Sequence, residues 1–381
     1  MLSTTLVYIV LAIAAFPSIY YLIALFSTWR FFRRKSPASF GFAPPVSILK
    51  PIRGLDPDAY ENFASFCRLD YPEYEIVFCA GEDEPAVALI ERLKREYPER
   101  SIRILFGSGR TGAVNDKVAK LARLTSEARY EHLAISDSDV RVQPDYLHKL
   151  VAPLANPQTG AATCFYVSTG EKSFADRLQT VGMISDFYAG LLVARQLDGV
   201  KFALGTTIAT TRTHLTSFGG YGRIENKPAD DLLIGRLIAE QGYEVELLPY
   251  TIEAVSDYGS IGELLYKRMR WLVVMRHMRP WGHVGLIFAQ GLAWSIVAAV
   301  LAPGAAAGYL GAYVVLRLAM TWAIGVHGLK CRALWRKMPL VVVWDALATV
   351  LWLASFLRSS IRWRGGDYYI RDGLLVPASG D

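Results

Sequence analysis

The chain has 381 residues, of which 52% are hydrophobic, and it carries a formal net charge of +6 with a pI near 9.0. Soluble domains are usually about 45–50% apolar, so this composition indicates segments that enter a membrane. The positive charge suits an anionic partner, but neither zinc-finger spacing nor a Lys/Arg-rich tail is present, which argues against nucleic acid. The four cysteines form no CxxC pair and are expected to be reduced thiols.

The N-terminal segment Leu6–Phe26 is apolar and uncharged. Its length is sufficient to cross a hydrocarbon core of about 30 Å. A cleaved signal peptide is the alternative, which the absence of a positive start disfavours. Basic residues follow directly (Arg30, Arg33, Arg34 and Lys35), so the positive-inside rule places that end in the cytoplasm. We predict a transmembrane anchor over residues 1–28 and a basic linker over 29–45.

Short apolar segments then alternate with helical ones. The pattern predicts strands at Val46–Leu49, Glu75–Cys79, Ile102–Phe106 and His132–Ser136, with helices over Asp58–Arg68, Ala86–Glu96 and Asn115–Leu124. Such alternation predicts an α/β domain with a mostly parallel sheet and helices on both faces. Ligands of such sheets bind beyond the carboxyl ends of the strands. We assign residues 46–257 to one cytosolic catalytic domain.

The C-terminal third is membrane-like again. Residues 258–281 are amphipathic, and residues 282–381 contain three long apolar segments and a tail: His283–Leu301, Ala305–Val326 and Met338–Leu357, the last interrupted by Asp345. The basic loop Lys330–Lys337 is then cytoplasmic. Counting spans sends the tail outside, although it carries Arg358, Arg362, Arg364 and Arg371. A re-entrant last segment and a failure of the rule both stay open.

Two carboxylates stand at the end of the fourth predicted strand, in Ser136-Asp137-Ser138-Asp139. Asp137 and Asp139 could hold Mg²⁺ or Mn²⁺, hard cations that bridge to diphosphate oxygens. The alternative is a solvated turn, which Asp and Ser also favour.

Three further segments carry candidate chemistry. In Pro228-Ala229-Asp230-Asp231 an aspartate could act as a base towards a hydroxyl, or simply cap the following helix. In Lys267-Arg268-Met269-Arg270-Trp271, Arg270 could bind a diphosphate and Trp271 could pack beside an acceptor. The alternative, which does not exclude the first, is an interfacial helix that lies on anionic lipid. The acidic loop Glu82-Asp83-Glu84 could contact a nucleotide, or be only solvated.

In this order, these features resemble family-2-type glycosyltransferases with a GT-A fold, and more specifically ceramide glucosyltransferases and the related hopanoid-biosynthesis glycosyltransferases. The segments that carry the resemblance are Val46–Pro51 with Gly54, Leu69–Pro72 with Tyr74 and Glu75, Asn115–Lys117, Ser136–Ser138 with Arg141 and Val142, Gly205–Thr207 and 363–365. The resemblance covers nearly the whole chain. Lys267 departs from it, because the family has Gln or Arg at that position.

The resemblance implies a role for each matching residue. Asp231 would be the catalytic base, with Arg270 and Trp271 as the Arg-Trp pair of the active site. Asp83 or Glu82, Lys117, Asp137 and Arg270 would bind the donor, and Asp139 with Asp137 would hold the metal. UDP-glucose or UDP-N-acetylglucosamine would then donate one sugar, with inversion to a β-glycoside, to a hydroxyl of a ceramide- or hopanoid-type lipid. From the apolar segments and the basic flank of the first one, we expect a multi-pass protein, in a bacterial inner membrane, with its catalytic domain on the cytoplasmic side.

Two alternative functions and the role of one segment stay open at this stage. A processive β-glycan synthase shares these motifs but usually has more membrane helices, and a non-catalytic membrane protein could bind a nucleotide-sugar without turnover. The segment Ser173–Leu204, with Met183, Phe187, Tyr188, Leu191 and Leu192, could form the acceptor entrance or an ordinary core helix.

Overall fold

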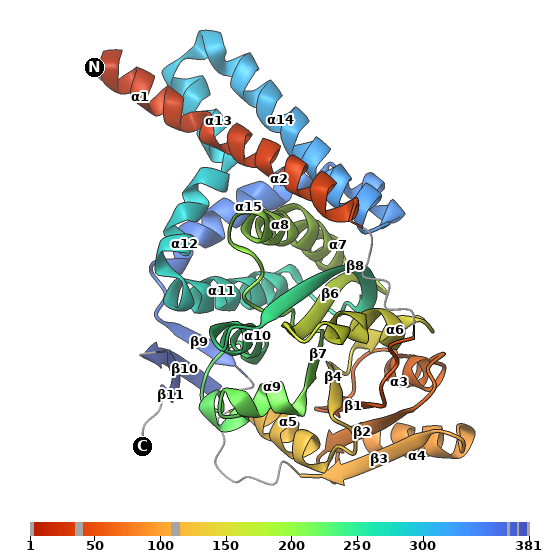
Figure 1. Cartoon of the computed structure of the whole chain (residues 1–381). Helices are drawn as coiled ribbons and strands as arrows, with labels where there is room; N and C mark the ends of the chain where they lie inside the picture. Colours follow the sequence, from red (N-terminus) through yellow and green to blue (C-terminus); the bar gives the residue numbers. More distant parts are fainter. Residues whose placement is uncertain (1–3, 35–40, 108–114, 364–365, 372, 379–381) are drawn as a thin grey trace. The chain divides into compact units, whose positions relative to one another are not determined.

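The computed structural model describes residues 4–34, 41–107, 115–363, 366–371 and 373–378. Residues 35–40 of the predicted linker lie outside these ranges, as do residues 364–365 of the C-terminal segment that carries part of the family resemblance. The chain folds into two compact units (Figure 1). The first, here called the helical unit, contains Met1–Arg34, Lys172–Gly199 and Tyr258–Asp381, and the second, the sheet unit, contains Lys35–Glu171 and Val200–Asp257. The range 46–257 predicted as one domain therefore includes a segment, Lys172–Gly199, that packs with the helical unit.

The sheet unit is built on one eight-stranded sheet with the order β3-β2-β1-β4-β7-β6-β8-β5. The strands are β1 (Val46–Pro51), β2 (Tyr74–Ala80), β3 (Ser101–Phe106), β4 (His132–Ser136), β5 (Val140–Arg141), β6 (Thr159–Thr169), β7 (Thr207–Thr211) and β8 (Glu244–Val255). β3, β2, β1 and β4 run parallel, as predicted, whereas β7 is antiparallel to both β4 and β6. The sheet is therefore mixed, and the sequence pattern did not show the strands after β4.

Helices cover both faces of the parallel half, because successive strand residues point to opposite sides. Alternate strand residues, such as Ile48, Ile76 and Phe78, join the core that contains Phe63 and Phe66 of α3. The opposite face packs against α5. The helices of this unit are α3 (Ala59–Cys67), α4 (Ala86–Glu96), α5 (Asp116–Glu127), α6 (Tyr146–Val151), α9 (Arg212–Ser217) and α10 (Asp230–Glu240). The three predicted helices are confirmed within a few residues.

The helical unit contains apolar helices from both ends of the chain. Its elements are α1 (Thr4–Ala14), α2 (Phe16–Phe32), α7 (Phe174–Gly182), the π-helix η2 (Met183–Phe187), α8 (Tyr188–Asp198), α11 (Ile261–Met278), α12 (Pro280–Gly285), α13 (Gly291–Leu301), α14 (Ala306–Trp322), the π-helix η6 (Ala323–Gly328), the short helix η7 (Arg332–Lys337), α15 (Leu340–Ser355) and the strands β9 (Ser360–Trp363), β10 (Gly366–Arg371) and β11 (Leu374–Pro377). β9, β10 and β11 form a small antiparallel sheet.

Two helices among the described residues are long and apolar enough to cross a membrane: Thr4–Phe32 and Pro303–Gly328. The pair Pro280–Ala289 and Gly291–Leu301 would be a third span, but it is bent by 53°. α15 has 16 residues, which at 1.5 Å per residue gives about 24 Å, short of the hydrocarbon core. The last predicted apolar segment thus contains a helix shorter than a regular span.

The segment Lys172–Gly199 is fixed to α14 and α15 by close packing and by buried polar contacts. Gly182 is required at its position, because a Cβ atom there would lie 2.3 Å from the ring of Trp344. Arg317 of α14 donates to Asp345 of α15, with Nε 2.9 Å from Oδ2, and also donates to the Ser185 carbonyl. Both charged side chains are buried. An ion pair at this depth is stable only when its hydrogen bonds are satisfied, as they are here.

Candidate active site

Three neighbouring strands place the candidate residues at one edge of the sheet unit. β1 and β4 are parallel neighbours, so the residues that follow each strand emerge at the same edge. β7 is antiparallel to β4, with Thr207 opposite Ser136, so the residues that precede β7 reach this edge too. The Asp137 amide donates to the Thr206 carbonyl at 3.2 Å. The loops 137–139 and 205–206 therefore meet here.

Lys117 joins the two acidic segments at this edge. Its Nζ lies 2.7 Å from Oδ1 of Asp137 and 3.4 Å from Oδ2 of Asp230. Lys117 stands in the first turn of α5, which is capped by the Asn115 side chain accepting from the Val118 amide. Burial alone would lower the pKa of Lys117, but Asp137 and Asp230 outweigh it and raise that pKa. The lysine therefore stays charged, and it brings Asp137 within reach of the start of α10.

Asp231 is held in the first turn of α10 without being used as a cap. The N-cap position belongs to Ala229, whose φ of 58° is left-handed and unfavourable for a residue with a Cβ atom. The alternative interpretation of Asp230 and Asp231, in which one of them caps the helix, is therefore wrong. Burial, and then the neighbouring charge of Asp230, raise the pKa of the Asp231 carboxyl to about 6. A carboxyl with this pKa is ionised near neutrality yet basic enough to accept a proton.

Gly205 leaves the space that the Asp231 carboxyl occupies. A Cβ atom on Gly205 would lie 2.7 Å from Oδ2 of Asp231. Gly205→Ala is expected to lower kcat by about 10²-fold, because a misplacement of about 1 Å can cost that much. Tm should change little, since the displaced atom is the end of a side chain. Gly308→Ala is the control, because a Cβ atom there meets nothing within 4 Å; wild-type kcat for Gly205→Ala would contradict a role for the carboxyl.

Asp139 fits one side of a cation site. Its Oδ1 atom is buried and has no hydrogen-bond partner within the described part of the chain. Burial, and then the charges of Asp137 and Asp56, raise the pKa of Asp139 to about 7. Both observations mark excess negative charge that a cation would offset. Among the residues that the structure describes, no group of three or more His, Cys, Asp or Glu side chains could hold a metal by itself. Donor phosphate oxygens would therefore have to complete the coordination, as is common for Mg²⁺.

Lys50 is a residue of this edge to which the sequence analysis gave no role. It is fully buried on the α3 face of β1, with Nζ 3.8 Å from the centroid of the Phe66 ring and 2.8 Å from the Asp137 carbonyl. Burial lowers the pKa of Lys50 to about 7, although nearby carboxylates oppose this. The sequence signal for Lys50 was a lysine at the end of an apolar strand. A charge buried at such a position requires a polar partner, so it indicates a cluster of polar groups nearby.

The acidic loop after β2 does not join this cluster. Glu82 and Asp83 are exposed, and no hydrogen bond or ion pair links either of them to the cluster within the ranges described. Glu84 instead accepts from the Gly54 amide at 2.5 Å. The predicted contact of Glu82 or Asp83 with the donor stays a prediction.

Arg270 and Trp271 lie on α11 of the helical unit. Within the described residues no carboxylate pairs with Arg270, and the Trp271 ring packs against Phe187, with centroids 5.8 Å apart. Arg268 is buried and bonded to Asp186 at 2.7 Å. The basic residues of this helix therefore do not form a uniform face for anionic lipid, because α11 packs against α7 and α15.

The segment proposed as acceptor entrance is largely a core element. Met183, Tyr188, Leu191 and Leu192 are buried, which supports the interpretation as a core helix. Phe187 is the exception, since it is partly exposed beside Trp271. It ends the π-helix η2, an irregularity often found at functional sites.

The architecture is that of GT-A glycosyltransferases. The mannosyltransferase PcManGT from Pyrobaculum calidifontis, solved with GDP-Man and Mn²⁺, matches 90% of this chain and 99% of its own with a TM-score of 0.52 and 20% identity. The sequence profile of glycosyl transferase family 21 matches residues 9–376, so the chain belongs to this family.

Two curated relatives from Caenorhabditis elegans agree with this assignment. Ceramide glucosyltransferase 3 is 22% identical over 345 residues, which cover 88% of this chain and 74% of that protein. Ceramide glucosyltransferase 1 is 24% identical over 293 residues, which cover 73% of this chain and 62% of that protein. The chain is therefore a glycosyltransferase similar to ceramide glucosyltransferases, as the sequence predicted.

Proposed function

We propose that this protein transfers one sugar from a UDP-sugar to the hydroxyl of a membrane lipid, with inversion at the sugar carbon. The observation that carries the proposal is Asp231, a carboxyl with a pKa near 6, held beside Gly205 in a charged edge of a GT-A sheet. The family and the names of the relatives support a ceramide-type acceptor and UDP-glucose, with UDP-N-acetylglucosamine and a hopanoid as the alternatives to test.

The reaction would be a single displacement. Asp231 accepts the proton of the lipid hydroxyl while the hydroxyl oxygen forms a bond to C1 of the sugar. The bond from C1 to the diphosphate oxygen breaks, and its electron pair leaves with UDP. Attack opposite the leaving group turns an α-linked donor into a β-glycoside.

Lys117, Asp137 and Asp139 would serve the donor. The raised pKa of Lys117 keeps a positive charge beside Asp137, where it can face a diphosphate. Asp139 and Asp137 would hold Mg²⁺ or Mn²⁺, which when bound offsets the charge that develops on the leaving diphosphate. The roles of Glu82 or Asp83 in donor binding, and of Arg270 and Trp271 in the active site, remain proposals from the resemblance.

Two contacts within the helical unit support a cytoplasmic tail. The Tyr266 hydroxyl of α11 donates to the Arg362 carbonyl of β9, and Arg276 donates to the Arg358 carbonyl. In a bilayer, these bonds would keep the tail on the same side as α11. With the short length of α15, they favour a re-entrant last apolar segment, so that the arginines of the tail stay in the cytoplasm.

A transfer assay tests this function. The full-length protein in detergent with Mg²⁺ or Mn²⁺ is given UDP-glucose or UDP-N-acetylglucosamine with a ceramide or a polyhydroxylated hopanoid, and the lipid is analysed by mass spectrometry. We expect one hexose or N-acetylhexosamine on one acceptor, and loss of product with a chelator. A ladder of added sugars would instead identify a glycan synthase, and UDP-sugar binding without product in all four pairs would contradict the proposal.

The pH dependence follows from the raised pKa of Asp231. A base works only when ionised, so kcat/KM should fall as pH drops through about 6 and level off above it. Rates are measured at saturating metal, so that the protonation of Asp139 contributes little. Asp230→Asn removes a neighbouring negative charge and should move this limb to lower pH. If the fall in kcat/KM occurs at the same pH in Asp230→Asn as in the wild type, the ionisation that limits the rate belongs to a group other than Asp231.

A further inference from the structure

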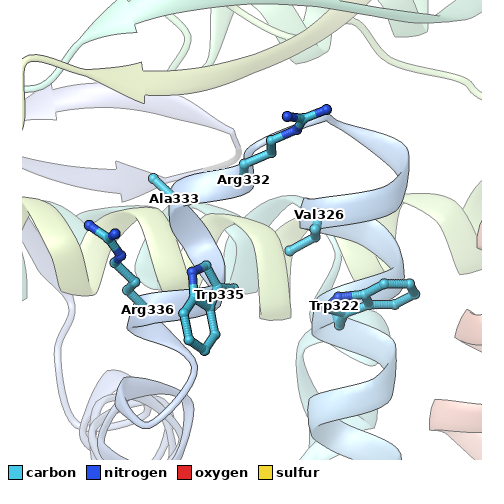
Figure 2. A pocket seen from close by; sticks show the side chains of 6 residues that line it. All are labelled: Trp322, Val326, Arg332, Ala333, Trp335 and Arg336. Atoms are coloured by element: carbon cyan, nitrogen blue, oxygen red, sulfur yellow. The ribbon is translucent and has the colours of Figure 1, made fainter.

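The helical unit contains a cavity that the proposed transfer reaction does not use. Its volume is about 620 Å³, and its walls come from three consecutive elements (Figure 2). Trp322 ends α14 and Val326 belongs to the π-helix η6, whereas Arg332, Ala333, Trp335 and Arg336 stand on η7. One wall is therefore apolar and aromatic, and the other adds two guanidinium groups.

The basic residues of this region give it a positive charge. The segment Lys330–Lys337 contains four basic residues and no acidic one. Arg332 and Arg336 are exposed, and no carboxylate pairs with either of them within the described residues. Guanidinium groups bind phosphate oxygens by paired, charge-assisted hydrogen bonds. Because no carboxylate of the described residues occupies the two guanidinium groups, their N–H donors are available to a phosphate.

The cavity also stands at one end of a membrane span. The helix Pro303–Gly328 is long and apolar enough to cross a bilayer, and the cavity begins in its last two turns. Trp322 and Trp335 are 50% and 64% exposed. Tryptophan is enriched at the boundary between the acyl chains and the head groups. A ligand here would meet apolar side chains at one end and arginines at the other.

We propose that this cavity binds an anionic phospholipid, with Arg332 and Arg336 on the head-group phosphate and an acyl chain along Trp322 and Val326. A free phosphate ion would gain nothing from the apolar wall. A zwitterionic lipid would bring a cation towards four basic residues. Basic pockets beside membrane helices on the cytoplasmic side favour anionic lipids for these reasons. The site concerns a lipid other than the sugar acceptor and does not depend on the transfer reaction.

Native mass spectrometry of the full-length protein in detergent tests the proposal. Phosphatidylglycerol, phosphatidylcholine and inorganic phosphate are titrated separately. We expect phosphatidylglycerol to bind at least about tenfold more tightly than phosphatidylcholine, and the double variant Arg332→Gln/Arg336→Gln to lose about tenfold or more in that affinity. Arg332→Lys/Arg336→Lys keeps the charge but loses the paired geometry, so its affinity for phosphatidylglycerol should fall between those of the wild type and the double glutamine variant Arg332→Gln/Arg336→Gln.

The matched control is Arg33→Gln/Arg34→Gln, which removes the same charge after another apolar helix, α2. It should bind phosphatidylglycerol like the wild type. A second readout guards against misfolding, because phosphatidylglycerol should raise the Tm of the wild type and of this control but not that of Arg332→Gln/Arg336→Gln. Equal binding of the two lipids, an equal loss in the control, or inorganic phosphate binding as tightly as the lipid would each overturn the proposal.

Discussion

Replacing Asp231 by asparagine is expected to lower kcat by about 10²- to 10⁴-fold, the usual contribution of a general base. The amide keeps the shape of the side chain but cannot accept the proton of the acceptor hydroxyl. Binding of the UDP-sugar should be retained, because Lys117 and Asp137 are unchanged. The measurement is single-turnover transfer at saturating donor, with donor affinity determined separately by calorimetry.

Stability separates this prediction from a folding defect. Burial raises the pKa of Asp231 above its unfolded value, so ionisation costs stability as pH rises from about 4 to about 6. The neutral asparagine removes that cost, and its Tm at neutral pH should equal or exceed that of the wild type. Asp230→Asn is the neighbouring control and should lose less activity. Turnover close to wild type in Asp231→Asn would remove Asp231 as the base.

The second large effect concerns the buried ion pair of the helical unit. Asp345→Leu is expected to destabilise the protein by about 3–5 kcal/mol, because it leaves Arg317 buried without its carboxylate. Nη2 of Arg317 lies 2.5 Å from Oδ1 of Asp345, and the Tyr313 hydroxyl donates to Oδ2 at 2.9 Å. The measurement is Tm in detergent, followed by intrinsic fluorescence.

A double variant provides the control for this pair. Arg317→Met/Asp345→Leu replaces both charges by apolar groups of similar size, and it should recover much of the loss, since a buried pair is often no more stable than an apolar substitute. Equal destabilisation in the single and double variants would show that packing, rather than the unpaired charge, determines the effect.

The parallel half of the sheet was predictable because its local signals agree. β1 to β4 are short apolar segments that alternate with helical ones, acidic motifs follow β2 and β4, and the structure confirms these strands with small shifts of their ends. Asp137 and Asp230 could not be placed together from spacing alone. Lys117, which bonds to both, comes from a third segment, and only the sheet order brings these segments to one edge.

Other features depend on tertiary contacts that no local pattern encodes. Lys172–Gly199 is as amphipathic as an ordinary core helix, and its place in the helical unit depends on Arg317 and Trp344, far along the chain. Arg268 seemed suited to anionic lipid from its neighbours in sequence, yet it pairs with Asp186. Lys50 could be noticed as a charge at the end of an apolar strand, but its partners only become visible in the fold.

The central claim is that Asp231 activates a lipid hydroxyl for a single displacement, and the anomeric configuration of the product tests it most directly. The wild-type glycolipid is made from an α-linked UDP-sugar, purified, and examined by proton NMR at C1. The account predicts only the β-anomer, and a rate of product formation about 10²- to 10⁴-fold lower for Asp231→Asn under the same conditions. An α-linked product would contradict it, because retention requires a mechanism other than one direct displacement.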